Sequence, residues 1–274
     1  MSDGGAGEGR PARGIRLPFT LAAAALEFLT PIRLTGQKAP SETAIGRSSA
    51  LFPFVGLLLG LLLVGVDRSA SFVFPRLLID ALVIAALAGA TGGLHLDGLA
   101  DTADGLFGGH SREQRLAIMR DPRIGSFGTL AIVLLILVQW TALRALDAPW
   151  RRPGLLLFPV LGRSAMVCAL AAFPYAREQG LGTLFRRYVW PWPFLVAELS
   201  GLIAAIACFG GSGVALWGAS LLVPVALGVG ISALLGGLTG DSYGAICEIT
   251  QLTVLLLIDS AHQTGWLLPW LVRG

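Results

Sequence analysis

Long apolar stretches alternate with short polar connections along most of this chain. Seven of the apolar stretches have about the length needed to cross a roughly 30 Å hydrocarbon core. They cover residues 49–66, 77–92, 126–143, 154–173, 194–209, 214–235 and 249–268. We therefore predict an all-α polytopic membrane protein with about seven transmembrane helices.

The N-terminal region departs from this pattern. The apolar stretch 17–32 is short and carries Glu27, which favours a helix lying at the membrane interface over a transmembrane helix. Residues 1–16 are rich in Gly and Arg and are expected to form a flexible tail. No internal repeat divides the rest, so residues 17–274 are predicted to be a single integral membrane catalytic domain.

Composition excludes the soluble classes of protein. Of the 274 residues, 54% are hydrophobic and 14% are charged, whereas soluble domains carry about 25% charged residues. The net charge of +3 comes from dispersed arginines without a dense basic run, so no nucleic-acid partner is expected and membrane lipid is the expected surrounding. Cys168, Cys208 and Cys247 lie far apart, which predicts neither a disulfide framework nor a zinc site.

Basic residues also predict the orientation. Thirteen of the 20 Lys and Arg residues fall on the side that holds residues 1–48, 93–125, 174–193 and 236–248. The positive-inside rule assigns that side to the cytoplasm. Every polar motif described next lies on the same side.

The first motif, Thr91–Gly109, contains three aspartates. Asp97, Asp101 and Asp104 are spaced i, i+4 and i+7, so a helix would present them on one face. Three like charges on one face repel, and a bound cation is the usual reason to tolerate them. Carboxylates suit Mg²⁺ or Mn²⁺, which also bind substrate phosphates. The alternative is a solvated acidic loop, which the interleaved leucines at helical spacing make less attractive.

His95 stands two residues before the first aspartate. It could act as a general base near neutral pH. A structural histidine, or one that orients a metal-ligating aspartate, is an equally good interpretation.

Arginines follow the acids. Arg112, Arg115, Arg120 and Arg123 form a basic loop, and a guanidinium binds phosphate with two hydrogen bonds. The helix expected near Gly125 would offer free N–H groups to an anion. The alternative is that these arginines only set the orientation of the chain in the membrane. This explains Arg112 and Arg115 well, and it explains Arg120 and Arg123 less well.

Arg163 lies inside an apolar stretch, and Arg177 follows Tyr175 soon after it. A buried membrane arginine is costly and is a functional candidate by default. The alternative is a structural pair with an intramembrane acid such as Glu27.

The last motif is the Gly-rich polar stretch 236–251. Asp241 is read as a further metal or substrate ligand, with Ser242 beside it as a substrate contact. Glu248 is a second substrate candidate, although an acid at the start of a helix is an ordinary feature.

These motifs together resemble one family, the cobalamin (5'-phosphate) synthases, also called adenosylcobinamide-GDP ribazoletransferases. The resemblance rests on HLDGLADTADGLFGG, MRDPRIGSFG, GRSAM, the PYAR and GLG segments and GLTGDSYGA–CEI, in the order of the family and over most of residues 27–258. The opening around Glu27 lacks the Arg-Leu-Pro form expected there.

The resemblance implies transfer from adenosylcobinamide-GDP to α-ribazole or its 5'-phosphate, with GMP as a product and Mg²⁺ as the cofactor. The resulting site comprises catalytic His95, Asp104 and Arg123; metal ligands Asp97, Asp101, Asp104 and Asp241; and substrate contacts Glu27, Arg120, Arg123, Arg163, Arg177, Ser242 and Glu248. It also implies the bacterial inner membrane, with the active site on the cytoplasmic face. A homo-oligomer, or association with other enzymes of cobalamin assembly, is compatible with it.

Other membrane proteins fit the motifs less well. A CDP-alcohol phosphotransferase would have Arg where Asp101 follows Asp97-Gly98-Leu99-Ala100. A UbiA-type prenyltransferase would need a better second acidic motif than Asp241 and Glu248. An ion-coupled transporter would place its acids near the bilayer midplane, within repeated halves.

Overall fold

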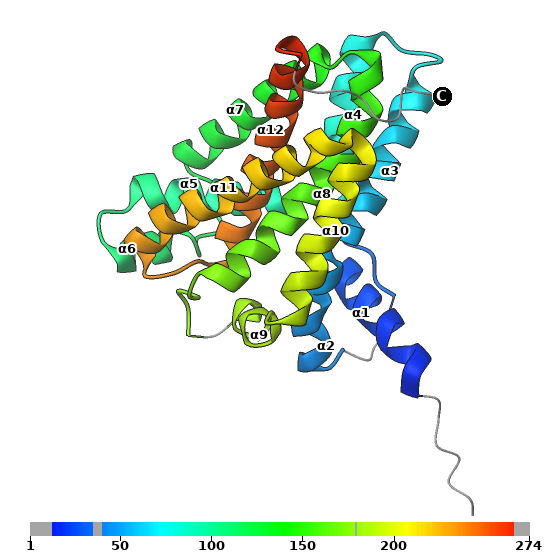
Figure 1. Ribbon diagram of the computed structural model, residues 1–274. Coiled ribbons are helices and arrows are strands. Elements are labelled where there is room, and N and C mark those ends of the chain that lie inside the picture. The colour runs from blue at the N-terminus through cyan, green and yellow to red at the C-terminus, as the bar shows by residue number, and fades with distance from the viewer. Residues whose placement is uncertain (1–12, 35–39, 179, 266–274) are drawn as a thin grey trace, which may run out of the picture.

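The computed structural model describes residues 13–34, 40–178 and 180–265 (Figure 1). This part of the chain is helical and contains no β-strand. In chain order its helices are α1 (Arg13–Leu29), α2 (Glu42–Arg47), the 3-10 helix η1 (Ser48–Leu51), α3 (Phe52–Ala70), α4 (Arg76–Ala90), α5 (Leu94–Gly108), α6 (Arg112–Ile118), α7 (Ser126–Ala145), α8 (Ala148–Ala172), α9 (Leu181–Tyr188), α10 (Trp192–Phe209), α11 (Gly211–Leu235) and α12 (Gly240–Gln263).

Six of the described helices are long and apolar enough to cross a membrane. They are the continuous helical stretch 42–70, which ends with α3, and α7, α8, α10, α11 and α12. The pair α4 and α5 would add a seventh, but these two helices meet at an angle of 88°. The prediction of an all-α polytopic membrane protein is confirmed.

The N-terminal helix is apolar and too short to be one of the six. It packs beside α2, η1 and α3 at one end of the bundle (Figure 1). Residues 1–12 of the predicted tail lie outside the described residues, and Arg13 already belongs to α1.

The most buried span, α8, forms the centre of the bundle. It packs most extensively against α3. A methyl group on Gly56 would lie 2.5 Å from the backbone oxygen of Pro159, and one on Gly60 would lie 2.7 Å from that of Leu156. Gly56 and Gly60 thus form a small-xxx-small pair that lets α3 and α8 pack with their backbones in contact.

The bend between α4 and α5 is made by two glycines. Gly92 and Gly93 have φ angles of 61° and 72°, in the left-handed region that favours glycine. Helix α4 thus ends at Ala90, and the acid-bearing α5 turns away across the bundle. The sequence predicted a single apolar span here over 77–92 and did not predict the bend.

A network of buried ion pairs joins α3, α4 and α8 at the end of the bundle away from α1. Arg151 of α8 is 3% exposed and lies 2.6 Å from both Asp67 of α3 and Asp80 of α4. Arg76 lies 3.1 Å from the same Asp80 carboxylate. Two positive and two negative side chains balance here, which is the condition under which membrane proteins tolerate buried charge.

Candidate active site

Two glycines let α5 and α12 cross closely, and this crossing gathers acidic residues. A methyl group on Gly98 would lie 2.7 Å from the backbone oxygen of Asp241, and one on Gly244 would lie 3.4 Å from the Cα of Gly98. Because the two backbones are in contact, Asp97 and Asp101 of α5 lie near Asp241 at the start of α12. Asp101 interacts electrostatically with both of the other carboxylates.

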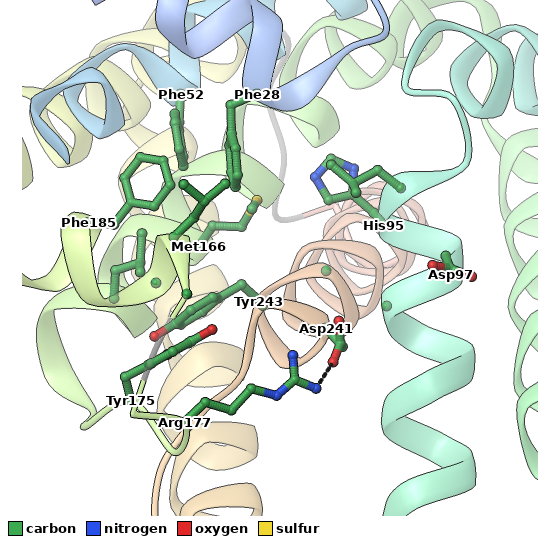
Figure 2. A pocket seen from close by; sticks show the side chains of 18 residues that line it. Phe28, Phe52, His95, Asp97, Met166, Tyr175, Arg177, Phe185, Asp241 and Tyr243 are labelled. Carbon is green, nitrogen blue, oxygen red and sulfur yellow. Dashed lines mark hydrogen bonds and ion pairs between the residues drawn. The ribbon is translucent and has the colours of Figure 1, made fainter. Parts of the chain in front are cut away.

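Arg177 reaches the acids through a contact between two loops. Tyr175 and Leu238 form an isolated bridge between the α8–α9 and α11–α12 connections. The N–H of Ala176 donates to the Leu238 oxygen at 2.8 Å. This contact places Arg177 so that its Nη2 donates to Oδ2 of Asp241 at 2.7 Å (Figure 2). Both side chains keep about a fifth of their surface exposed, at 18% and 23%, so the ion pair sits at the edge of the bundle.

The ion pair lies on the wall of a cavity of about 310 Å³, called the enclosed cavity here because it is less open than its neighbour described below. Figure 2 shows that the wall has two kinds of surface. The polar part holds His95, Asp97, Tyr175, Arg177 and Asp241, and the apolar part holds Phe28, Phe52, Met166, Leu170, Leu181 and Phe185. A molecule with a polar and an apolar half would match this cavity.

Behind the cavity, a buried arginine fixes the histidine. Arg163 is fully buried; its Nη1 donates to Gln251 at 2.8 Å, and its Nη2 lies 3.4 Å from Nδ1 of His95. Since arginine can only donate, Nδ1 of His95 is the acceptor and the neutral ring carries its proton on Nε2. That Nε2 is buried without a protein partner. His95 is therefore suited to donate a hydrogen bond, which does not fit the predicted role of general base.

The sequence offered Glu27 as an alternative partner for Arg163, but the structure places Glu27 elsewhere. Glu27 of α1 accepts a 2.6 Å hydrogen bond from the N–H of Leu34 and lines a second, more open cavity of about 670 Å³. This open cavity also contacts Phe28 and Asp97. Asp97 thus lies between the enclosed cavity and the open one.

Asp104 occupies different surroundings from the other acids of α5. Its Oδ2 accepts from the N–H of Gly125 at 2.7 Å, and its Oδ1 accepts from the N–H of Gly128 at 2.8 Å. The carboxylate thereby caps the first turn of α7, where free N–H groups favour a negative charge. Each oxygen accepts a backbone hydrogen bond and the side chain is buried, so the structure gives Asp104 a capping role in place of the metal-ligand and catalytic roles predicted for it.

Ser242 and Glu248 also lie apart from the cavity wall. Ser242 is buried and forms a capping box with Thr239 at the start of α12. Glu248 is buried farther along α12, where Gln139 donates to it at 3.4 Å. Ser242 stabilises the helix in this arrangement, and Glu248 belongs to the same buried polar region as Arg163.

The arginines around α6 divide into two groups. Arg112 and Arg120 line a polar groove of about 360 Å³ that also includes Arg177. Arg123 is 86% exposed and forms a two-pronged ion pair with Asp121, whose pKa its hydrogen bonds lower to about 2. Arg120 thus lies near Arg177, while Arg123 does not line any of these cavities.

The acids form an incomplete set of donors for a metal ion. Among the described residues, no three His, Cys, Asp or Glu side chains are arranged to hold a metal ion by themselves. Magnesium is usually bound by one or two carboxylates together with waters and substrate phosphates. Asp97, Asp101 and Asp241 offer this kind of incomplete donor set beside the guanidinium of Arg177.

Sequence reasoning missed the aromatic part of the cavity. Phe28, Phe52 and Phe185 come from α1, α3 and α9, and each looked like an ordinary membrane residue. A usable signal was present only around α9, a short amphipathic helix that Gly180 precedes and that has Gly182 in its first turn. The buried partner of Arg163, Gln251, was also missed.

The fold and the site together define a class of protein. The fold is a helical membrane bundle, and the site combines clustered carboxylates with an arginine on the wall of a cavity. These features are typical of integral membrane enzymes that act on phosphorylated substrates. Comparison with known proteins gives the family. Residues 21–258 match the family model described as cobalamin-5-phosphate synthase, and the chain belongs to this family.

Curated relatives carry a consistent name. A protein of Roseiflexus sp. (strain RS-1) is 38% identical over 87% of this chain and 88% of its own length. A protein of Pseudomonas savastanoi pv. phaseolicola is 41% identical over 88% of this chain and 98% of its own. One of Herpetosiphon aurantiacus is 38% identical over 88% and 97%. All three are named adenosylcobinamide-GDP ribazoletransferase. No solved structure matches the chain.

Proposed function

We propose that this protein transfers the adenosylcobinamide-phosphate part of adenosylcobinamide-GDP to α-ribazole or its 5'-phosphate and releases GMP. The name shared by its relatives supports this activity. The observation that carries the proposal is the grouping of Asp97, Asp101 and Asp241 with Arg177 at the α5–α12 crossing, beside an enclosed cavity. That grouping provides what transfer between a diphosphate and a hydroxyl requires.

In the proposed reaction, a ribose hydroxyl of the acceptor attacks the corrinoid-side phosphorus of the diphosphate. A new P–O bond forms, the P–O bond to GMP breaks, and GMP leaves with the bonding electron pair. One carboxylate of the cluster takes the hydroxyl proton. Little covalent work falls to the protein, so positioning and electrostatic stabilisation carry the rate.

The protein's own donors would stabilise the phosphates. Arg177 offers a guanidinium at the cavity wall. Tyr175 lies beside it, and burial raises the pKa of this phenol, so it stays protonated and can donate. The N–H on Nε2 of His95 is a third donor with no protein partner. Arg163 acts through His95, because it fixes the tautomer.

Asp97, Asp101 and Asp241 are the residues we assign to Mg²⁺, together with oxygens of the diphosphate. A bound Mg²⁺ would neutralise charge on the transferred and leaving phosphates. Asp104 is left out of this set because both of its oxygens cap α7.

We further place the protein in the bacterial inner membrane with this site on the cytoplasmic face. The asymmetry of Lys and Arg supports that orientation. A homo-oligomer, or an assembly with other enzymes of cobalamin synthesis, stays a prediction.

The activity is tested by giving purified protein adenosylcobinamide-GDP and α-ribazole or α-ribazole 5'-phosphate, and then identifying the products. GMP and a cobalamin formed in equal amounts are expected. Turnover of a CDP-alcohol or prenyl diphosphate substrate, with release of CMP or pyrophosphate and without GMP formation from the corrinoid substrate, would contradict the proposal.

A further inference from the structure

We propose that the aromatic end of the enclosed cavity binds the base of the acceptor nucleoside. The aromatic end is formed by Phe28, Phe52 and Phe185. The base of α-ribazole is dimethylbenzimidazole, a flat, bicyclic and apolar ring. This assignment rests on the proposed function and adds to it the location and the chemistry of one substrate.

The three rings form a contiguous aromatic cluster. Phe28 and Phe52 stack with centroids 5.6 Å apart and planes 11° from parallel. Phe185 approaches both, at 4.7 Å from Phe28 and 5.4 Å from Phe52, with tilted planes. Phe52 and Phe185 are buried, while Phe28 stays partly accessible. Aromatic surfaces of this kind stack on flat bases.

The surroundings of the rings are apolar. Met166 and Leu170 of α8 and Leu181 of α9 line the same cavity, and Figure 2 shows Met166 beside the rings. Asp97, Arg177 and Asp241 lie away from the rings, and Tyr175 and Tyr243 lie between the two groups (Figure 2). An exocyclic amine on a purine would lose its hydrogen bonds to water among these side chains, and that costs free energy. Dimethylbenzimidazole has no exocyclic amine, so its transfer from water costs much less free energy and the aromatic end should favour it.

The volumes of the two cavities indicate which substrate each of them binds. A cavity of about 310 Å³ lies at the lower limit for small-ligand sites and suits a nucleoside. The corrin ring with its nucleotide is far larger than such a space. The open cavity of about 670 Å³, which also includes Asp97 and the partly accessible Phe28, is left for the donor.

The same placement orients the acceptor for reaction. With its base against the phenylalanines, the attached ribose points toward the polar end, where Asp97, Arg177 and Asp241 lie. The reacting hydroxyl then meets the carboxylate cluster, between the enclosed cavity and the open one. An opposite placement would put the ribose hydroxyls among apolar side chains.

Two variants at accessible side chains test the assignment while leaving the packed core of the protein intact. Phe28→Leu removes one partly accessible ring, and Leu181→Trp adds bulk from a side chain that is 49% exposed. Phe28→Leu should raise the KM for α-ribazole about tenfold, the size expected for losing one base–aromatic contact. The KM for adenosylcobinamide-GDP should change little in Leu181→Trp, because Leu181 lines the enclosed cavity and not the open one, whereas Phe28 lines both. Leu181→Trp should raise the KM for α-ribazole more than that for the smaller riboside of unsubstituted benzimidazole.

Phe107→Leu is the matched control, because Phe107 is 67% exposed and its ring contacts Phe127 outside the cavity. Binding is also read without turnover, as the rise in Tm that α-ribazole alone produces. That rise should be smaller in Phe28→Leu than in Phe107→Leu.

The proposal is overturned if the wild-type protein forms GMP but neither cavity variant changes the KM for α-ribazole more than Phe107→Leu does. It is also overturned if Leu181→Trp raises the KM for adenosylcobinamide-GDP instead, because the corrinoid would then occupy the aromatic end. Failure of the proposed function looks different: the wild-type protein would form no GMP, and the Tm measurement would still decide whether α-ribazole binds at Phe28.

Discussion

Asp97 and Asp104 lie on the same face of α5 yet have different partners. Seven residues of helix separate them by about 10 Å along the axis. Asp97 lies where α12 crosses, and Asp104 lies where α7 begins. The spacing in the sequence correctly predicted the shared face. It could not predict which neighbouring helix covers each turn, so Asp104 was assigned to the metal.

This difference gives a matched pair of substitutions. Asp104→Asn removes a charged acceptor from a buried helix cap, and we expect it to lower the free energy of unfolding by about 1–3 kcal/mol. Asp97→Asn, at an exposed position, should leave stability unchanged and lower kcat by about a hundredfold or more. Thermal unfolding in detergent and GMP release measure the two effects. An unchanged Tm for Asp104→Asn together with a large loss of kcat would return Asp104 to the catalytic set.

Among the helices, α12 shows most clearly that hydropathy can misplace the start of a transmembrane helix. The predicted span began at residue 249, but the helix begins at Gly240 with its capping box. Residues 242–248 are buried within the bundle, so the polar ones among them are compatible with a span although they lower its hydropathy. Arg163, in contrast, was recognisable, because a single charge within an apolar stretch stands out.

The close crossing of α5 and α12 leads to the next prediction. Gly98→Ala would place a methyl group 2.7 Å from the backbone oxygen of Asp241, so the helices must move apart. We expect GMP release to fall by at least about tenfold, since displacing catalytic groups by even 1 Å is costly. Gly65→Ala is the control, because nothing lies within 4 Å of a methyl group there. Equal activity of the two variants would show that the crossing does not position the acids.

Across the molecule, the site depends on contacts that no local pattern encodes. The cavity joins α1, α3 and α9 to the motif-bearing helices, and its aromatic residues lie up to 157 positions apart, from Phe28 to Phe185. The fold class followed from apolar length alone, because few structures can satisfy the backbone within lipid. The bend at Gly92 and Gly93 did not follow, since glycines are common throughout this chain.

The proposed orientation can be measured with two single cysteines. Glu113→Cys lies on α6 near the candidate site, and Ser69→Cys lies near the far end of α3; both positions are exposed. A membrane-impermeant maleimide applied to spheroplasts should label Ser69→Cys, and it should label Glu113→Cys only after the membrane is disrupted. The unsubstituted protein controls for its own cysteines, of which Cys208 and Cys247 are buried. The reverse labelling pattern would place the site on the periplasmic face.

The central claim is that the acids at the α5–α12 crossing support magnesium-dependent transfer from adenosylcobinamide-GDP. The most direct test measures GMP release by the detergent-purified wild-type protein and by Asp97→Asn and Asp241→Asn, each with Mg²⁺ and with EDTA. We predict that the wild-type protein forms GMP and a cobalamin with Mg²⁺, that EDTA stops the reaction, and that both variants are severely impaired while folded. Equal GMP release by the wild-type protein and both variants, or release that persists in EDTA, would contradict the account.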